Sequence, residues 1–177
     1  MDRARDPDHY NRWDITAPRY HRPQISSPPD IITPMSSSFS VRRADWNLDR
    51  DHLRGIREAV FVCEQLVPLE LEWDEADAAC VHVLAEDDSG TPIGTGRLLP
   101  DGHIGRMAVL PTWRRRGVGA ALLTELMRIA WERGFAEVVL NAQTQAMAFY
   151  GRHGFSAEGE AFLDAGIPHR RMRRALP

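Results

Sequence analysis

The segment Ile104–Leu123 restricts the fold more than any other part of this sequence. An apolar run leads through Arg114–Arg116 into a turn with two glycines and then into a second apolar run, which predicts a strand, a tight turn and a helix in succession. Gly117 and Gly119 remove side chains where backbone N–H groups could approach a ligand, and a helix N-terminus adds partial positive charge. The segment therefore predicts an anion-binding site flanked by cations.

The predicted turn does not match the common nucleotide-binding loops. There is no G-x-x-x-x-G-K-[ST], and Gly117-Val118-Gly119-Ala120-Ala121-Leu122 lacks the third glycine of the dinucleotide fingerprint. Instead, Arg114-Arg115-Arg116-Gly117-Val118-Gly119 resembles the [QR]-x-x-G-x-[GA] loop of the GCN5-related N-acetyltransferases, the GNAT family, in which loop amides hold the pyrophosphate of acetyl-CoA. For the hexapeptide alone, a glycine-started helix behind a solvated basic turn is the plainer alternative.

The resemblance extends along the chain. Asn141–Phe155 is similar to the family segment in which a helix ends in a tyrosine and a glycine-phenylalanine pair begins the next strand. Gly55–Gln65, Leu140–Gln143 and Gly166–His169 resemble one subgroup, the small bacterial proteins called ElaA-like or YjcF-like. A match from about Phe39 to Arg173 is too long for a chance motif.

Apolar periodicity predicts strands and helices that alternate along the rest of the chain. Strands are predicted at 39–43, 81–86, 92–99, 102–110, 136–141, 154–163 and 168–174, and helices at 49–65, 117–133 and 144–152, with an acidic loop or short helix at 70–79. Asp49 or Asp51 is the expected start of the first helix. This order predicts an α/β or α+β sheet with helices packed on it. The resemblance implies the GNAT fold, a mixed central sheet with a V-shaped splay between strands 4 and 5, flanked by about four helices.

The first 38 residues differ in composition from the remainder. Six prolines stand among Asp, Arg and Ser without apolar periodicity, which predicts a disordered tail before a domain at 39–177. Met35 lies just before the first predicted strand, so it is an alternative initiator. With 43% hydrophobic and 27% charged residues, the chain suits one globular domain.

Charge and cysteine usage limit the function classes. A formal net charge of −3 gives no general attraction to nucleic acid, and the arginine clusters show no interleaved aromatic residues for base stacking. Cys63 and Cys80 lack C-x-x-C spacing, and no secretory signal or membrane span is evident, so we expect a cytoplasmic protein without membrane association. No histidine pair has zinc spacing, and no metal is expected. A homodimer is neither indicated nor opposed.

The resemblance implies which residues bind acetyl-CoA. Main-chain groups of Met107 and Val109 would pair with the pantetheine as an added strand does, although both side chains also fit core positions. Gln143 stands seven residues before Tyr150, where many relatives carry an asparagine that contacts the cofactor, and this chain departs from them there. The residues implied to hold the pyrophosphate are Arg114, Arg115, Arg116, Gly117, Val118, Gly119 and Ala120.

Acetyl transfer to an amine needs a proton for the departing thiolate and a base for the nucleophile. Tyr150 corresponds to the family tyrosine that protonates or hydrogen-bonds the CoA sulfur, with an aromatic core position as the alternative. For the base we favour Glu72, then Glu64, over the other members of an acidic group in which most side chains are expected to be solvated: Glu70, Asp74, Glu75 and Asp77.

Three further residues are candidates for contact with the acceptor. His82 on a predicted strand could serve as a base near neutral pH, or simply be hydrogen-bonded in place. Asn141 at a strand end could orient the substrate or terminate the sheet edge. His169, in the subgroup motif Gly166-Ile167-Pro168-His169, would line the acceptor pocket.

The leading functional hypothesis is an acetyl-CoA-dependent N-acetyltransferase acting on a primary amine of a small molecule or peptide. Cys63 has no evident base partner, so direct attack in a ternary complex is favoured over an acyl-enzyme route. The alternative is a catalytically degenerate GNAT domain that binds acyl-CoA or a protein partner.

Overall fold

The computed structural model describes residues 38–177. The predicted tail, apart from Ser38, and the alternative initiator Met35 lie outside the described residues. In the described part, seven strands form one sheet in the order β1-β2-β3-β4-β5-β7-β6. The strands are β1 (Phe39–Ala44), β2 (Val81–Asp87), β3 (Pro92–Leu98), β4 (His103–Val109), β5 (Glu137–Gln143), β6 (Ser156–Asp164) and β7 (Ile167–Ala175).

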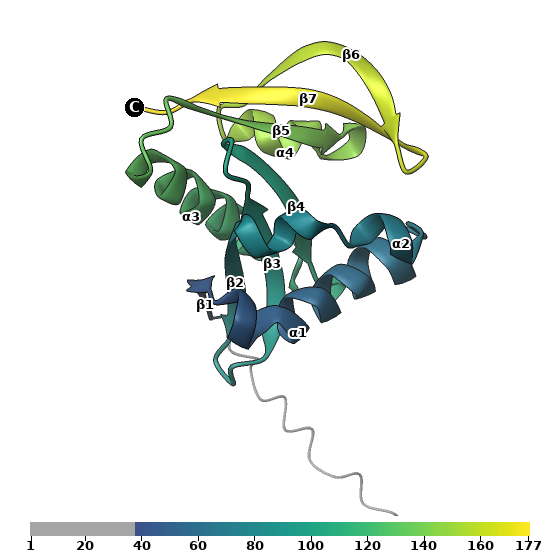
Figure 1. Cartoon of the computed structure of the whole chain (residues 1–177), viewed down its shortest axis with the longest axis vertical. Helices are drawn as coiled ribbons and strands as arrows, with labels where there is room; N and C mark the ends of the chain where they lie inside the picture. Colours follow the sequence, from purple (N-terminus) through teal and green to yellow (C-terminus); the bar gives the residue numbers. More distant parts are fainter. Residues whose placement is uncertain (1–37) are drawn as a thin grey trace, which may run out of the picture. The chain divides into compact units, whose positions relative to one another are not determined.

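The helical elements lie between β1 and β2 and on either side of β5 (Figure 1). Four are α-helices, in agreement with the expected number, and the others are single 3₁₀ turns or a π-helical segment. The α-helices are α1 (Trp46–Arg57), α2 (Leu69–Glu72), α3 (Val118–Glu132) and α4 (Met147–Arg152), and the remaining elements are η1 (Glu58–Glu64), η2 (Glu75–Ala79), η3 (Pro111–Trp113) and η4 (Thr144–Ala146).

The first helix begins earlier than the sequence predicted. Asp45 is its N-cap, because the Asp45 carboxylate accepts hydrogen bonds from the backbone N–H groups of Asn47 and Leu48. Asp49, one of the two expected caps, instead accepts hydrogen bonds from both terminal nitrogens of the Arg42 guanidinium, each at 2.8 Å. Leu53 and Ile56 of α1 and Val60 of η1 are buried along one face, whereas Cys63 is exposed.

Two helices cover opposite faces of the β2–β4 part of the sheet. Successive residues of β2 point to opposite faces, so Val83 and Ala85 pack in the core that α3 covers. Leu84 lies in a second core with Leu53 of α1. The sheet is therefore buried on both sides here and can hold its strands rigidly beneath a site.

Glycine in β3 lets α3 approach the sheet closely. A Cβ atom built on Gly94 would lie 3.0 Å from Leu122 Cδ1, 3.1 Å from Val118 Cγ1 and 3.2 Å from the main-chain oxygen of Ala108. Because α3 carries the predicted anion-binding turn at its start, this contact fixes where the turn lies relative to the strands.

We expect Gly94→Ala to lower the free energy of unfolding by about 1 to 2 kcal/mol, because the added methyl group must displace a helix side chain or a backbone oxygen. Urea denaturation measures the effect. The matched control is Gly55→Ala in α1, where nothing lies within 4 Å of a built Cβ atom and helix propensity alone should be neutral or stabilising. Equal effects of the two substitutions would contradict the close approach.

The parallel pair β4–β5 is the point at which the sheet divides. Only two register pairs join these strands, His103 with Val139 and Ile104 with Leu140, whereas all other neighbouring strands are antiparallel. Beyond Ile104 and Leu140 the two strands diverge, as the upper and lower groups of strands in Figure 1 show. The expected splay between strands 4 and 5 of a mixed sheet is confirmed.

Candidate functional site

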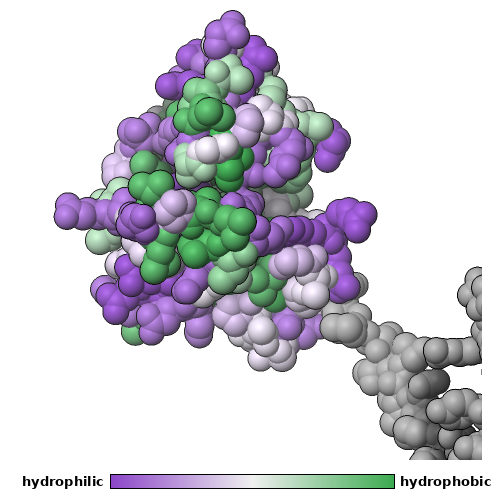
Figure 2. Space-filling model, turned by 90° about the vertical axis from the view of Figure 1, so that its right-hand side faces the viewer, coloured by the Kyte–Doolittle hydropathy of each residue, from purple (hydrophilic) through white to green (hydrophobic). Residues whose placement is uncertain are grey.

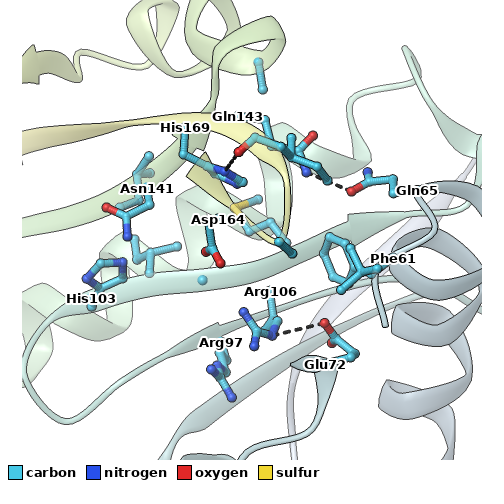
Figure 3. A pocket seen from close by; sticks show the side chains of 18 of the residues that line it. Phe61, Gln65, Glu72, Arg97, His103, Arg106, Asn141, Gln143, Asp164 and His169 are labelled. Carbon is cyan, nitrogen blue, oxygen red and sulfur yellow. Dashed lines mark hydrogen bonds and ion pairs between the residues drawn. The ribbon is translucent and has the colours of Figure 1, made fainter. Parts of the chain in front are cut away.

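A cavity of about 350 Å³ opens where β4 and β5 diverge. Its floor comes from these two strands, one wall from η1 and α2, and the opposite wall from the turn between β6 and β7 (Figure 3). Of the residues singled out in the sequence, the cavity brings together the following: Glu72, Met107, Asn141, Gln143, Tyr150 and His169.

The turn before α3 has the geometry of an anion site. Gly117 is the N-cap with φ 89° and ψ −9°, and no side chain caps the helix. The first intrahelical bond runs from Ala121 N to Gly117 O at 3.0 Å, so the N–H groups of Val118, Gly119 and Ala120 are left for a ligand.

We expect Gly117→Ala to weaken acyl-CoA binding by about 10-fold, because a side chain at positive φ costs about 1 to 2 kcal/mol and shifts the loop amides. Gly134→Ala is a matched control: Gly134 has φ 82° at the other end of the same helix, and nothing lies within 4 Å of a built Cβ atom. Calorimetric titration with acetyl-CoA measures the affinity. Similar losses in both variants would show that strain in α3, rather than the loop, sets the affinity.

Arg114 ties this turn to the ends of β4 and η1. Its Nε donates to the main-chain oxygen of Val109 at 3.0 Å, and Nη1 and Nη2 donate to the Glu64 carboxylate at 2.7 and 2.5 Å. The guanidinium holds the pKa of Glu64 below its usual range. Glu64 is not among the residues that line the cavity. Its pairing with Arg114 makes it a weaker base than a carboxylate in the cavity.

A β-bulge interrupts β4 inside the cavity. The register with β3 shifts between Thr95 and Arg97, so that Arg106 and Met107 together stand opposite one β3 residue, and Arg106 has φ 49°. A non-glycine residue at positive φ is strained, and such strain clusters at functional sites. A bulge disrupts the regular ladder of main-chain bonds, so main-chain groups of Arg106 and Met107 can serve a ligand between the strands.

Tyr150 lies at the other side of the same gap. Its ring packs edge-on against Phe149 and Phe155, and its hydroxyl lies 3.8 Å from Met107 Sδ on the bulged strand. Burial raises the pKa of Tyr150 to about 12. The phenol therefore stays protonated at neutral pH and can donate its hydrogen to an anion that forms next to Met107.

Glu72 is held by two arginines at the cavity wall. Arg57 Nε donates to Glu72 Oε1 at 2.5 Å, and Arg106 Nε lies 3.3 Å from Glu72 Oε2. The Glu72 side chain is 3% exposed. Burial raises the pKa of this carboxyl against the opposing effect of Arg57 and Arg106. A raised carboxyl pKa suits a general base that works near neutral pH.

The ion pairs of Glu72 belong to a larger, mostly buried network. The Asp77 carboxylate accepts hydrogen bonds from Arg57 Nη1 at 2.8 Å and from Arg97 Nη1 at 2.5 Å. Arg97 also donates to Asp74 at 2.7 and 2.8 Å, which lowers the pKa of the Asp74 carboxyl. Because every charged group in this network has an opposite partner, burial of the charges is tolerated. The network fixes Glu72 in place.

His82 lies inside this network rather than at the cavity. Its Nε2 bonds the main-chain oxygen of Asp77 at 2.8 Å, its ring stacks on Trp46, and it is 2% exposed. Burial lowers the pKa of the His82 imidazole. His82 does not line the cavity. Its contacts therefore support a histidine that is simply hydrogen-bonded in place over one that acts as a base on the acceptor.

The polar side chains on the β5–β7 wall face the cavity. His169 Nδ1 lies 2.8 Å from the main-chain oxygen of Ile167, and because a carbonyl oxygen only accepts, Nδ1 carries a hydrogen. Gln143 Nε2 donates to Gln65 Oε1 of the opposite wall at 2.8 Å, which links β5 to the residue after η1 across the gap (Figure 3). Asn141, from β5, also lines the cavity.

The cavity also contains residues that the sequence did not single out: Phe61, Gln65, His103, Arg106 and Asp164. A signal existed for Arg106, because Gly105 interrupts a predicted strand and isolated strand glycines often mark bulges. For Asp164 the only signal was a turn between two predicted strands. Burial lowers the pKa of His103, so its imidazole is neutral near pH 7.

A cleft between diverging strands, one of which leads on to an uncapped helix N-terminus, defines a site for an extended ligand with an anionic group, as in acyl-CoA-dependent transferases. The family model described as the acetyltransferase (GNAT) domain matches residues 50–176. The chain belongs to the GNAT acetyltransferase family and is an acyltransferase that uses acyl-CoA as cosubstrate and an amine as acceptor.

Relatives of this chain are found among curated proteins and solved structures. The Bacillus subtilis protein named "uncharacterized N-acetyltransferase YjcF" is 42% identical over 67% of this chain and 87% of its own length. An acyl-CoA N-acyltransferase from Pseudomonas aeruginosa is 33% identical with a TM-score of 0.66 over 78% of this chain and 99% of its own. Escherichia coli ElaA is 25% identical with a TM-score of 0.69 over 77% and 99%.

Two features are absent from residues 38–177. This part of the chain has no helix with the length and apolar character needed to cross a membrane. It also has no cluster of three or more His, Cys, Asp or Glu side chains arranged to hold a metal ion.

Proposed function

We propose that this enzyme transfers the acetyl group of acetyl-CoA to a primary amine of a small molecule or peptide, by direct attack in a ternary complex. The observation that carries the proposal is the two-residue pairing of β4 with β5, which opens a cavity lined by Met107 and Tyr150. The uncapped start of α3 lies against their near neighbours, because a Cβ atom built on Gly119 would lie 3.8 Å from Val109 and 3.7 Å from Phe149. A donor held at that turn can reach the cavity, where the acceptor lies. The expected cytoplasmic location stays a prediction.

Backbone groups would hold the donor. The amides of Gly117, Val118, Gly119 and Ala120, with Arg115 and Arg116 beside them, suit the pyrophosphate, because uncapped helix N–H groups attract anions. Met107 would offer main-chain groups along the gap, and Gln143 closes it from β5. Val109 is outside the cavity lining and its main-chain oxygen accepts from Arg114, so its N–H is the group we propose for the donor. Acyl-CoA supplies the activated thioester.

The side chains in the cavity match the proton transfers that the reaction needs. As the amine nitrogen bonds to the carbonyl carbon and the C–S bond breaks, the amine loses a proton and the thiolate gains one. In the proposed step the Glu72 carboxylate accepts the proton that the amine loses, and the Tyr150 hydroxyl donates the proton that the thiolate gains. Amides of the bulge at Arg106 and Met107 would stabilise the carbonyl oxygen.

The alternative is a domain that binds acyl-CoA without transferring its acyl group. The ion pairs of Glu72 with Arg57 and Arg106 favour it, because a paired carboxylate is a weaker base. The two functions can be told apart because a transferase releases CoA when an amine is present, whereas a binding domain releases none.

The test is a thiol-detection assay of CoA release from acetyl-CoA with a panel of amines, amino acids, polyamines and peptides. Release that depends on an amine, with the acetylated product identified by mass spectrometry, supports transfer. Calorimetric binding of acetyl-CoA without release across the panel would establish the binding module instead. Absence of both would overturn the proposed site at the start of α3.

A further inference from the structure

One of the charged side chains that line the cavity has no partner among residues 38–177. Four charged side chains line it: Glu72, Arg97, Arg106 and Asp164. The first three belong to the buried network, in which three arginines and three carboxylates neutralise one another: Arg57, Arg97, Arg106, Glu72, Asp74 and Asp77. Asp164 forms no salt bridge or side-chain hydrogen bond with any of residues 38–177. The cavity therefore presents one uncompensated negative charge, which attracts a cation.

The hairpin fixes Asp164 at the cavity. Asp164 and Ile167 are a register pair of β6 and β7, and the two residues between them, Ala165 and Gly166, have φ 47° and 77°. Positive φ at both central positions is typical of the tight type I′ turn, which leaves the flanking residues little freedom. In Figure 3 the Asp164 carboxylate points into the cavity, between Asn141 and Arg106 in this view.

The opposite wall is apolar. Phe61, Val67 and Leu71 line the cavity from η1 and α2, and the Leu71 side chain is 55% exposed. Nearby leucines are exposed as well, with 81% for Leu66 and 47% for Leu69. Figure 2 views the molecule from the side on which α2 lies in Figure 1, and it shows a hydrophobic area in the middle, bordered by hydrophilic residues. An exposed apolar area bordered by polar groups marks a surface that contacts a ligand.

From this pairing of a free carboxylate and an apolar wall we propose that the acceptor is a primary amine with an apolar alkyl or aryl group. Asp164 draws in the ammonium group, and the apolar group packs on the wall formed by Phe61, Val67 and Leu71. The proposal rests on the proposed N-acetyltransferase function. An amine that also carries a carboxylate would be repelled by Asp164, and a second ammonium group would be poorly solvated at the apolar wall.

The experiment compares phenethylamine, putrescine and phenylalanine as acceptors by the kcat/KM of CoA release. Calorimetry with the same amines and CoA-saturated protein measures binding without turnover. We expect kcat/KM for phenethylamine to exceed that for each of the other two by about 10-fold or more, because hydrophobic contact of this size gives discrimination of that order. Calorimetry should give the same order of affinities.

Two variants test the two contacts separately. We expect Asp164→Asn to lower kcat/KM for phenethylamine by about 10-fold, mainly through KM, because a charged hydrogen-bond acceptor is lost. Leu71→Ser should lower it by a similar factor and leave putrescine unaffected. The controls are Glu160→Gln, an exposed carboxylate of β6 outside the cavity lining, and Leu48→Ser, an exposed leucine of α1.

Each outcome decides between the claims. Preference for putrescine or phenylalanine, or equal effects of Asp164→Asn and Glu160→Gln, would overturn the proposed acceptor class. The transferase function would still stand in that case, provided that CoA release depends on an amine. If no amine causes CoA release, the transferase proposal fails, and calorimetry still decides the acceptor. Phenethylamine binding that Asp164→Asn weakens would then support the proposed ligand class, and absence of binding would reject it.

Discussion

We expect the Tyr150→Phe enzyme to release CoA about 100-fold more slowly than the wild type, because general acid catalysis contributes at least this factor in most enzymes that use it. The Tyr150 hydroxyl has no hydrogen-bond partner other than Met107 Sδ at 3.8 Å among the described residues, so it is available to the departing thiolate. Its pKa of about 12 keeps the hydroxyl protonated, so that it can donate a hydrogen bond to the thiolate as the C–S bond breaks. Steady-state kinetics with acetyl-CoA and a saturating amine measure the loss.

The phenylalanine variant keeps the ring contacts with Phe149 and Phe155, so the fold should be preserved. Affinity for acetyl-CoA should change little, and calorimetry provides that comparison. Unchanged turnover would eliminate the proposed role of Tyr150. A large loss of affinity with normal turnover at saturation would show instead that the hydroxyl holds the donor in its ground state.

Replacing Arg57 by alanine should lower the free energy of unfolding by about 3 to 5 kcal/mol, because removal of one partner leaves buried charges without compensation. Arg57 is 1% exposed, donates to Glu72 and Asp77, and lies 4.9 Å from the centre of the Trp73 ring. Urea denaturation measures the change.

Arg128→Ala is the comparison. Arg128 is half exposed on α3 and pairs with Glu125 and Glu132 one turn away on each side. Exposed pairs of this kind contribute about 0 to 1 kcal/mol. A loss below 1 kcal/mol for Arg57→Ala would mean that water or neighbouring side chains compensate the carboxylates.

Local patterns predicted the elements whose signal lies within a short segment. The start of α3 could be located because Gly117 and Gly119 stand between two apolar runs, and the end of α3 because Gly134 terminates it at φ 82°. The extra residues at the start of α1 were missed, because both Asp45 and Asp49 satisfy the sequence rule for a cap. Only the salt bridge to Arg42 shows that Asp49 is engaged elsewhere.

Long-range pairings could not be predicted in the same way. Arg57 and Asp77 are 20 residues apart, and Gln65 and Gln143 are 78 residues apart. No periodicity relates such positions, because their proximity depends on how loops place whole elements. The acidic group between 70 and 77 therefore could not be sorted from its sequence into the buried Glu72 and Asp77 and the exposed remainder.

The short seam between β4 and β5 has a mechanical consequence. Two register pairs contribute few main-chain bonds, so the two halves of the sheet are joined mainly by the side chains beneath them, such as Ile104, Leu122 and Leu140 in the core that α3 covers. A pantetheine chain lying along Met107 would supply main-chain bonds that this part of the sheet lacks. Loading of the donor would then stiffen the protein across its weakest junction, and slower amide exchange in β4 and β5 would report it.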